Sequence, residues 1–137
     1  MKPIQLFVGG FLSAVLIVSC TPLTDDCVCT AEFKTITVVI VDSDHQPIDS
    51  LNTVTSLKHS GLVMREDSSS ARPMYLLPGE YIVLTDAEKD FFTTFQEPVL
   101  LTASNSRHGV VAEFAFSLDR CQCHVWKSAG PDSIVAP

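Results

Sequence analysis

The sequence predicts an all-β protein, a single antiparallel β-sandwich of about seven strands that follows an N-terminal export segment. From Phe33 onward, valine, isoleucine, threonine and aromatic residues alternate with polar ones, and this period of two is typical of half-buried strands. Clusters rich in Asp, Ser, Asn, Pro and Gly separate the alternating runs, as turns do. No long stretch after the export segment has the periodicity of a helix, so a sandwich is the expected architecture.

The clearest strand covers residues 34–41 and ends at a turn cluster that begins with Asp42. Pro78 pre-sets φ and Gly79 accepts a positive φ, so together they predict a hairpin closed by a type II turn. Residues 90–95, which include three phenylalanines, fit a short strand or a half-buried loop with a packing role. The face formed by Val110, Ala112, Phe114, Phe116 and Leu118 is expected to be core. The expected strands cover residues 34–41, 51–57, 62–64, 74–77, 80–84, 98–101, 110–118 and 121–127.

Residues 1–19 have the layout of a signal peptide, with one lysine and then an apolar run. The run closes on Ile17-Val18-Ser19-Cys20, which resembles the lipobox of bacterial lipoproteins. The resemblance implies cleavage before Cys20, diacylglycerol on its thiol and a fatty acid such as palmitate on its amine, because several acyl chains are needed to hold a domain on a bilayer. The alternatives are an ordinary secretory peptide with a chance cysteine, or an uncleaved anchor helix.

The remaining chain divides into a lipidated tether (20–26), a β-sandwich domain (27–130) and a C-terminal tail (131–137). Asp25-Asp26 resembles the acidic surface-export signals of lipoproteins in the Bacteroidota, although a solvated acidic linker explains the pair equally well. The formal net charge of the full chain is −7, which argues against nucleic acid and against anionic lipid head groups as partners. The membrane is therefore expected as a partner only through the lipid.

Two motifs carry a further resemblance. Residues 37–48 run as a strand, an Asp turn and Pro47, and Leu77-Pro78-Gly79-Glu80-Tyr81 follows later. Together they resemble the transthyretin-like, Ig-like β-sandwich of carboxypeptidase regulatory-like domains, over roughly residues 33–118. His45 departs from the family's usual glycine, and the long serine loop and the terminal cysteine motifs depart as well. The resemblance implies a binding or scaffolding module of the Bacteroidota type, without catalytic residues to transfer.

Four cysteines remain once Cys20 is assigned to lipid: Cys27, Cys29, Cys121 and Cys123. An even number of cysteines in an exported domain favours structural disulfides. If the first and last strands pair antiparallel, the bonds would be Cys27–Cys123 and Cys29–Cys121, and parallel pairing would swap them. A bond within one Cys-x-Cys is the most strained option.

The same four thiols could instead form a tetrahedral zinc or copper site, with His124 beside them as a substitute ligand, or a redox-active set. Cys-x-Cys is tighter than the usual zinc spacing, and thiolates oxidise outside the cytoplasm, so disulfides are favoured. No cofactor is expected. Other polar groups fit solvated turns better than sites: Asp42, Asp44 and Asp49 lack a calcium loop pattern, and His45, His59 and His108 are scattered.

No nucleophile elbow, phosphate loop or zinc-protease motif occurs, so no catalytic residue is assigned. The sequence therefore predicts a non-catalytic, lipid-anchored protein of the cell envelope, on the outer membrane or cell surface if the cell is Gram-negative. Its expected partner is an envelope protein or glycan. A hydrolase would need His124 or His45 to meet a carboxylate and a nucleophile in a pocket, which no spacing in the sequence indicates.

Overall fold

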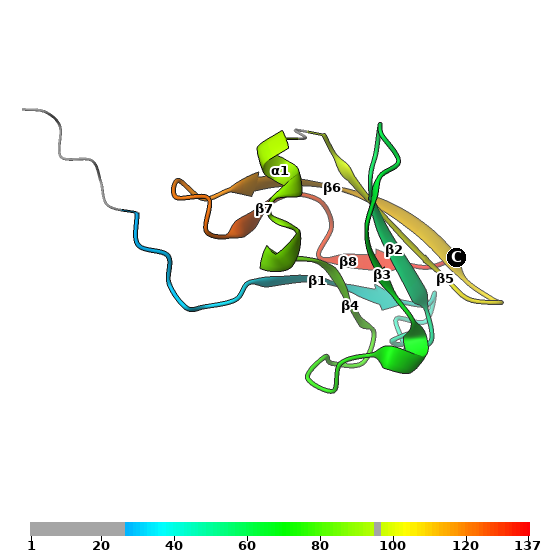
Figure 1. Ribbon diagram of the computed structural model, residues 1–137. Coiled ribbons are helices and arrows are strands. Elements are labelled where there is room, and N and C mark those ends of the chain that lie inside the picture. The colour runs from blue at the N-terminus through cyan, green and yellow to red at the C-terminus, as the bar shows by residue number, and fades with distance from the viewer. Residues whose placement is uncertain (1–26, 95–96) are drawn as a thin grey trace, which may run out of the picture.

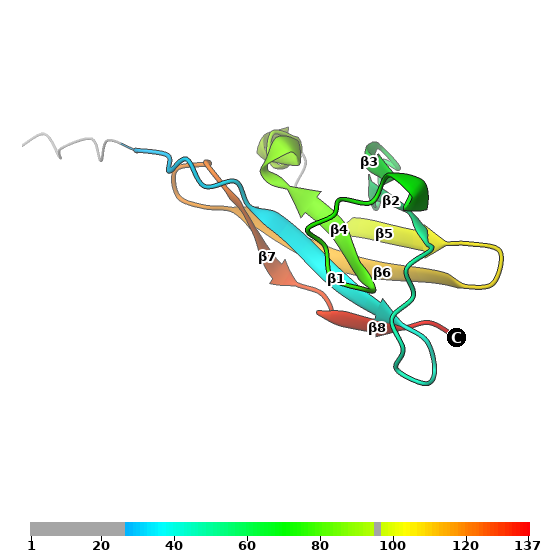
Figure 2. The ribbon, with the colours of Figure 1, turned by 90° about the horizontal axis from the view of Figure 1, so that it is seen from below.

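The computed structural model describes residues 27–94 and 97–137 of the chain. Within these residues two sheets form separate layers, as Figure 1 and Figure 2 show. One sheet has three strands in the order β4-β1-β8, and the other has five in the order β3-β2-β5-β6-β7. The predicted all-β sandwich is confirmed. The strands are β1 (Thr35–Val41), β2 (Asn52–Leu57), β3 (Val63–Asp67), β4 (Glu80–Thr85), β5 (Val99–Ser104), β6 (Gly109–Leu118), β7 (Val125–Ala129) and β8 (Ser133–Val135).

The strands pair antiparallel, as predicted, with one exception. β8 runs parallel to β1, with Ile40 opposite Ile134, and the Ala136 N–H donates to the Val41 carbonyl at 2.7 Å. Residues 131–137, expected to be a tail, therefore contribute a strand to the smaller sheet. Three residues are too few to display an alternating pattern, so this strand could not be predicted from a local pattern.

The hydrophobic core lies between the two sheets. Val38 and Ile40 of β1 are buried against residues of the larger sheet, including Leu101 and Phe114. On β6 the predicted core face is the one turned inward, with Val110 and Phe114 buried. Ala112, Phe116 and Leu118 are only partly buried, and they pack against the edge of the same cluster.

The connection from β1 to β2 is the predicted Asp turn. Oδ1 of Asp42 accepts the backbone N–H groups of Asp44 at 2.9 Å and Gln46 at 2.8 Å. Between them His45 has a φ of 59°, a left-handed conformation that glycine adopts most easily. The carboxylate of Asp42 is used within the turn itself.

Of the hairpin predicted around Pro78-Gly79, the turn is present and the first strand is not. The type II turn forms, because Glu80 N–H donates to the Leu77 carbonyl at 3.0 Å and Gly79 has a φ of 74°. Residues 74–77 are not a strand, so the hairpin prediction is wrong. Their backbone is used in a local turn in which Leu76 N–H donates to the Pro73 carbonyl at 3.2 Å. β4 pairs with β1 instead.

After β4 the chain turns through the 3₁₀ helix η2 (Asp86–Glu88) and the single-turn helix α1 (Phe91–Thr94). The aromatic segment expected to be a strand or loop is thus partly helical. Its packing role is confirmed, since Phe92 is buried with its ring centroid 5.8 Å from that of Phe116. A second short 3₁₀ helix, η1 (Ser69–Ala71), lies in the predicted serine loop.

Candidate functional site at the disulfide-bonded end

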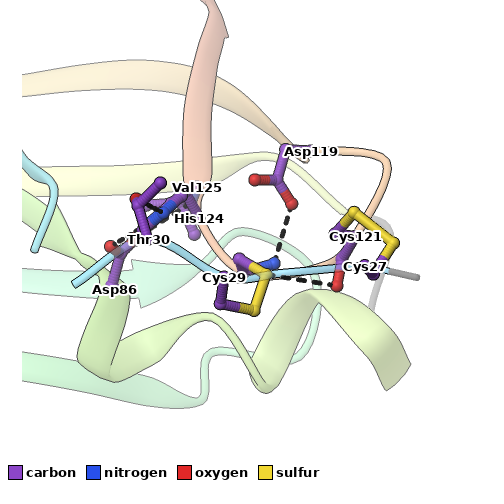
Figure 3. Close-up of a disulfide and its surroundings, with 9 residues drawn as sticks. Cys27, Cys29, Thr30, Asp86, Asp119, Cys121, His124 and Val125 are labelled. Carbon is purple, nitrogen blue, oxygen red and sulfur yellow. Dashed lines mark hydrogen bonds and ion pairs between the residues drawn. A yellow bond between two sulfur atoms is a disulfide. The ribbon is translucent and has the colours of Figure 1, made fainter. Parts of the chain in front are cut away.

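Two disulfides join the segment before β1 to the turn between β6 and β7 (Figure 3). Cys27 bonds Cys121 and Cys29 bonds Cys123, with Cα–Cα distances of 5.4 and 5.5 Å. The prediction of structural disulfides is confirmed. The connectivity is the one expected for parallel pairing, although neither cysteine segment is in a strand.

The last predicted strand, residues 121–127, begins too early. β7 starts only at Val125, because the preceding residues close a turn around Asp119. The Asp119 carboxylate accepts Cys123 N–H at 2.7 Å, its carbonyl accepts Gln122 N–H at 2.9 Å, and its N–H donates to the His124 carbonyl at 3.0 Å. The turn thereby places Cys121 and Cys123 next to the N-terminal segment that contains Cys27 and Cys29.

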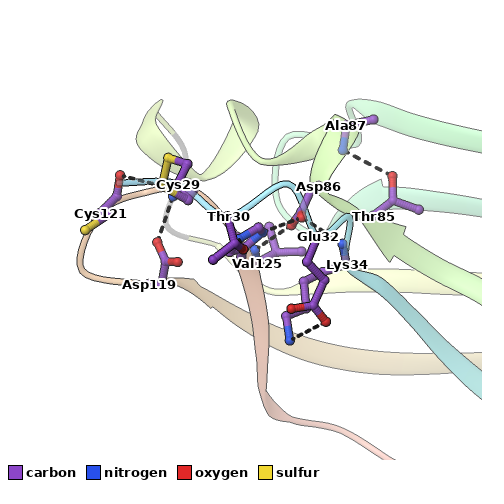
Figure 4. Close-up of polar contacts among 12 residues, drawn as sticks. Cys29, Thr30, Glu32, Lys34, Thr85, Asp86, Ala87, Asp119, Cys121 and Val125 are labelled. Atoms are coloured by element: carbon purple, nitrogen blue, oxygen red, sulfur yellow. Dashed lines mark hydrogen bonds and ion pairs between the residues drawn. A yellow bond between two sulfur atoms is a disulfide. The ribbon is translucent and has the colours of Figure 1, made fainter. Parts of the chain in front are cut away.

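Asp86, at the start of η2, lies at the centre of a second connection between the same segments (Figure 4). Its carboxylate accepts the backbone N–H of Lys34 at 2.8 Å and that of Val125 at 2.9 Å. It also lies 2.7 Å from Nδ1 of His124. Three parts of the chain, the N-terminal segment, η2 and β7, are therefore held by one buried carboxylate.

The electrostatics of Asp86 follow from these contacts. Burial opposes ionisation, but the hydrogen bonds from His124, Lys34 and Val125 outweigh it and lower the pKa of Asp86 below its ordinary value. The carboxylate is therefore ionised at neutral pH. A carboxylate can only accept, so Nδ1 of His124 donates in this hydrogen bond.

Nε2 of His124 lies 3.0 Å from Oγ1 of Thr30. Thr30, His124 and Asp86 thus form a chain of hydroxyl, imidazole and carboxylate, with the connectivity of a nucleophile, base and orienting acid. The same contacts also anchor the N-terminal segment. Neither Thr30 nor His124 lines the larger cavity described below, which favours the anchoring role.

His124 was expected beside the cysteines as a substitute metal ligand. The structure places its ring against Asp86 and Thr30 instead. The four predicted cysteines are paired in disulfides, so none of them offers a thiolate in this state. Over residues 27–94 and 97–137 there is no group of three or more His, Cys, Asp or Glu side chains placed to hold a metal.

The remaining polar residues named from the sequence are not brought together. Asp49 accepts a hydrogen bond from Gly79 N–H at 2.6 Å and pairs with Arg72, so it serves the turn rather than a metal. His59 lies near Glu97, with Nδ1 to Oε2 at 3.5 Å. The proposed lipidation site, Cys20, and residues 1–26 as a whole lie outside the described residues.

The Asp119 turn also lines a cavity of about 600 Å³. Its walls come from α1, the segment just before β5, the end of β6 and the turn itself. Neither this cavity nor the role of Asp86 was predicted from the sequence. One local signal was available for η2: Thr85 and Glu88 have the spacing of a capping box, and both of its hydrogen bonds form. The lining residues are Phe92, Glu97, Pro98, Ala115, Phe116, Ser117, Leu118, Asp119, Arg120 and Gln122.

The fold and the site define a small β domain closed at one end by two disulfides. No protein-family model, no curated protein and no solved structure matches the chain. In the part of the chain that the structure describes, no helix is long and apolar enough to cross a membrane.

Proposed function

We propose that this chain is an exported lipoprotein, anchored by acyl groups on Cys20, whose β-sandwich binds or scaffolds another component of the cell envelope. The observation that carries the proposal is the pair of disulfides, Cys27–Cys121 and Cys29–Cys123. Disulfides of this kind persist in oxidising compartments, which requires export. The signal-peptide layout of residues 1–19 and the lipobox-like Ile17-Val18-Ser19-Cys20 supply the route.

Binding rather than catalysis is favoured by how the polar groups are used. Asp86 is the carboxylate best placed to assist a base. It also accepts hydrogen bonds from the backbone N–H groups of Lys34 and Val125, which is a structural role. The resemblance to carboxypeptidase regulatory-like domains points the same way, since that family is non-catalytic. An envelope protein or glycan is the proposed partner, and the location follows from the anchor.

The anchor is tested by expressing the full chain in a Gram-negative bacterium fed with an alkyne analogue of palmitate. We expect the analogue to label the protein, the protein to fractionate with membranes, and Cys20→Ala to abolish the label. Cys27→Ala is the matched control, because it removes a cysteine seven positions later and should keep the label. A soluble, unlabelled protein would show an ordinary secretory peptide, and an unlabelled membrane protein of full mass would show an uncleaved anchor.

A further inference from the structure

The cavity beside the Asp119 turn has the size and the mixed chemistry of a small-molecule site. Its volume of about 600 Å³ falls within the range of ligand pockets. Phe92, Phe116 and Leu118 contribute apolar surface to it, and Ser117, Asp119 and Gln122 contribute donors and acceptors. The ring centroids of Phe92 and Phe116 lie 5.8 Å apart, so the two rings form one aromatic pair in the lining.

Two features of the backbone shape this cavity. The pairing of β6 with β7 is irregular between Ala115 and Phe116, where Phe116 faces Lys127 and Ser128 is the extra residue. Bulges of this kind redirect side chains and are frequent beside binding sites. The side chain of Phe116 is left only partly buried at the cavity wall.

The second feature is Gln122, which has a φ of 55°. A non-glycine residue adopts this conformation only where its surroundings impose it, and such residues concentrate at functional sites. The two neighbours of Gln122, Cys121 and Cys123, are each fixed by a disulfide. The disulfides therefore restrain the backbone of Gln122, an exposed residue in the lining of the cavity.

The charges of the cavity limit the class of ligand. Glu97 and Asp119 are acidic and Arg120 is basic, so the lining has an excess of negative charge and disfavours anionic ligands. Glu97 is held in place by the backbone N–H groups of His59 and Ser60. A ligand rich in hydroxyls can donate to the carboxylates and accept from the amide group of Gln122 at the same time.

From this combination we infer that the cavity binds a neutral saccharide, with the apolar face of a sugar ring against Phe116 and its hydroxyls on Gln122, Asp119 and Glu97. This inference rests on the proposed binding function and deepens it, because it names the ligand class and the site. Small-molecule sites combine an apolar wall with a few placed polar groups in this way.

Saturation-transfer NMR on the full chain tests the inference, with cellobiose, chitobiose, maltose and lactose as probes. We expect at least one disaccharide to bind saturably. Gln122→Gly should weaken that binding roughly three- to tenfold, the effect of losing one or two neutral hydrogen bonds. Glycine suits the backbone conformation at position 122, so the variant is expected to fold.

His45→Gly is the matched control. His45 has a φ of 59°, so glycine relieves the same backbone strain there. Its turn follows β1, and Figure 2 shows that turn and the one after β6 at opposite ends of the molecule. Binding should be unchanged in this variant.

Three outcomes would overturn the inference. No disaccharide binds, or Gln122→Gly binds as tightly as the wild type and the His45→Gly control, or a cationic probe such as benzylamine binds while the sugars do not. The anchor does not affect this test, because the full chain can be purified from either membranes or the soluble fraction. Sugar binding by an unlabelled protein would support the inference and contradict the proposed lipid anchor. An anchored protein that binds no sugar would do the reverse.

Discussion

Asp86 and His124 are separated by 38 positions in the sequence, yet the Asp86 carboxylate lies 2.7 Å from Nδ1 of the His124 ring in the folded protein. Both residues are buried. Through the backbone of Lys34 and Val125 the same carboxylate joins the start of β1 to the start of β7. The pair therefore connects the two sheets at the end that the disulfides also close.

Asp86→Asn should lower the free energy of unfolding at neutral pH by roughly 1–3 kcal/mol, because an amide cannot accept all three hydrogen bonds that the carboxylate accepts. The pKa of Asp86 is lowered in the folded state, so its charge stabilises the protein above the unfolded pKa of about 3.9. That contribution is lost as the pH falls through the lower folded value.

The difference between wild type and Asp86→Asn should therefore be largest near neutral pH and shrink in acid. Urea denaturation at several pH values measures it. Asp44→Asn, in the exposed turn after β1, is the control and should leave stability unchanged at neutral pH. A difference that grows in acid would contradict the assigned role of the carboxylate.

Thr30→Val should cost roughly 1 kcal/mol, since it removes the hydroxyl beside Nε2 of His124. If Thr30 only anchors the N-terminal segment, a fluorophosphonate probe will not label the wild-type protein. Thr30→Ser keeps the hydroxyl and should be nearly as stable as the wild type. Labelling that His124→Gln abolishes would instead show that the hydroxyl, imidazole and carboxylate act as a nucleophilic relay.

The two disulfides should not contribute additively. Each spans a sequence separation of 94, but once one is formed the other closes only a small ring around residues 27–29 and 121–123. Removing either disulfide alone should lower the free energy of unfolding by about 2 kcal/mol. Removing both should lower it by roughly 4–5 kcal/mol more than removing one.

A double-mutant cycle with Cys27→Ser/Cys121→Ser and Cys29→Ser/Cys123→Ser measures the coupling. The loss in the quadruple variant should exceed the sum of the two single-pair losses. A loss in the quadruple variant equal to that sum would show that the two disulfides act independently. Peptide mapping of the unreduced protein should recover Cys27 with Cys121, and recovery of Cys27 with Cys123 would contradict the connectivity.

Gly79→Ala should destabilise the protein more than Gly61→Ala. Both glycines have a positive φ, of 74° and 69°. A Cβ at position 79 would lie 2.7 Å from Cβ of Pro47 and 2.9 Å from the Ile40 carbonyl oxygen, whereas position 61 has nothing within 4 Å. We expect roughly 1–3 kcal/mol of additional loss from this overpacking.

Thermal denaturation of the two variants compares them directly, since the backbone strain of alanine is common to both positions. Similar melting temperatures would mean that β1 and the Pro47 turn move apart easily at this point.

Most strands could be predicted because their signal is local. β1, β2 and β6 alternate with a period of two over six to ten residues, and their turns contain the expected Asp, Pro and Gly. β8 has three residues and takes its place by pairing with β1, which no local pattern encodes. Residues 74–77 show the converse, since an apolar run between two prolines satisfies its backbone in a turn.

The candidate site was harder to predict than the strands, because it depends on tertiary contacts. Cysteine number and spacing predicted disulfides, but the connectivity depends on the direction in which two non-strand segments meet. Asp86 was not predicted because its partners, His124 and Val125, lie far along the chain. The cavity depends on where α1 and the Asp119 turn pack against β6, which only the folded chain defines.

The disulfides also decide how the domain would respond to mechanical force. Tension on the chain before Cys27 passes through the sulfur atoms to Cys121 and Cys123 before it reaches β1. The hydrogen bonds of β1 with β4 and β8 are thus shielded from a load that would otherwise peel the strand away one residue at a time. A domain pulled from its N-terminus would resist as a unit, with the β6–β7 turn as its point of attachment.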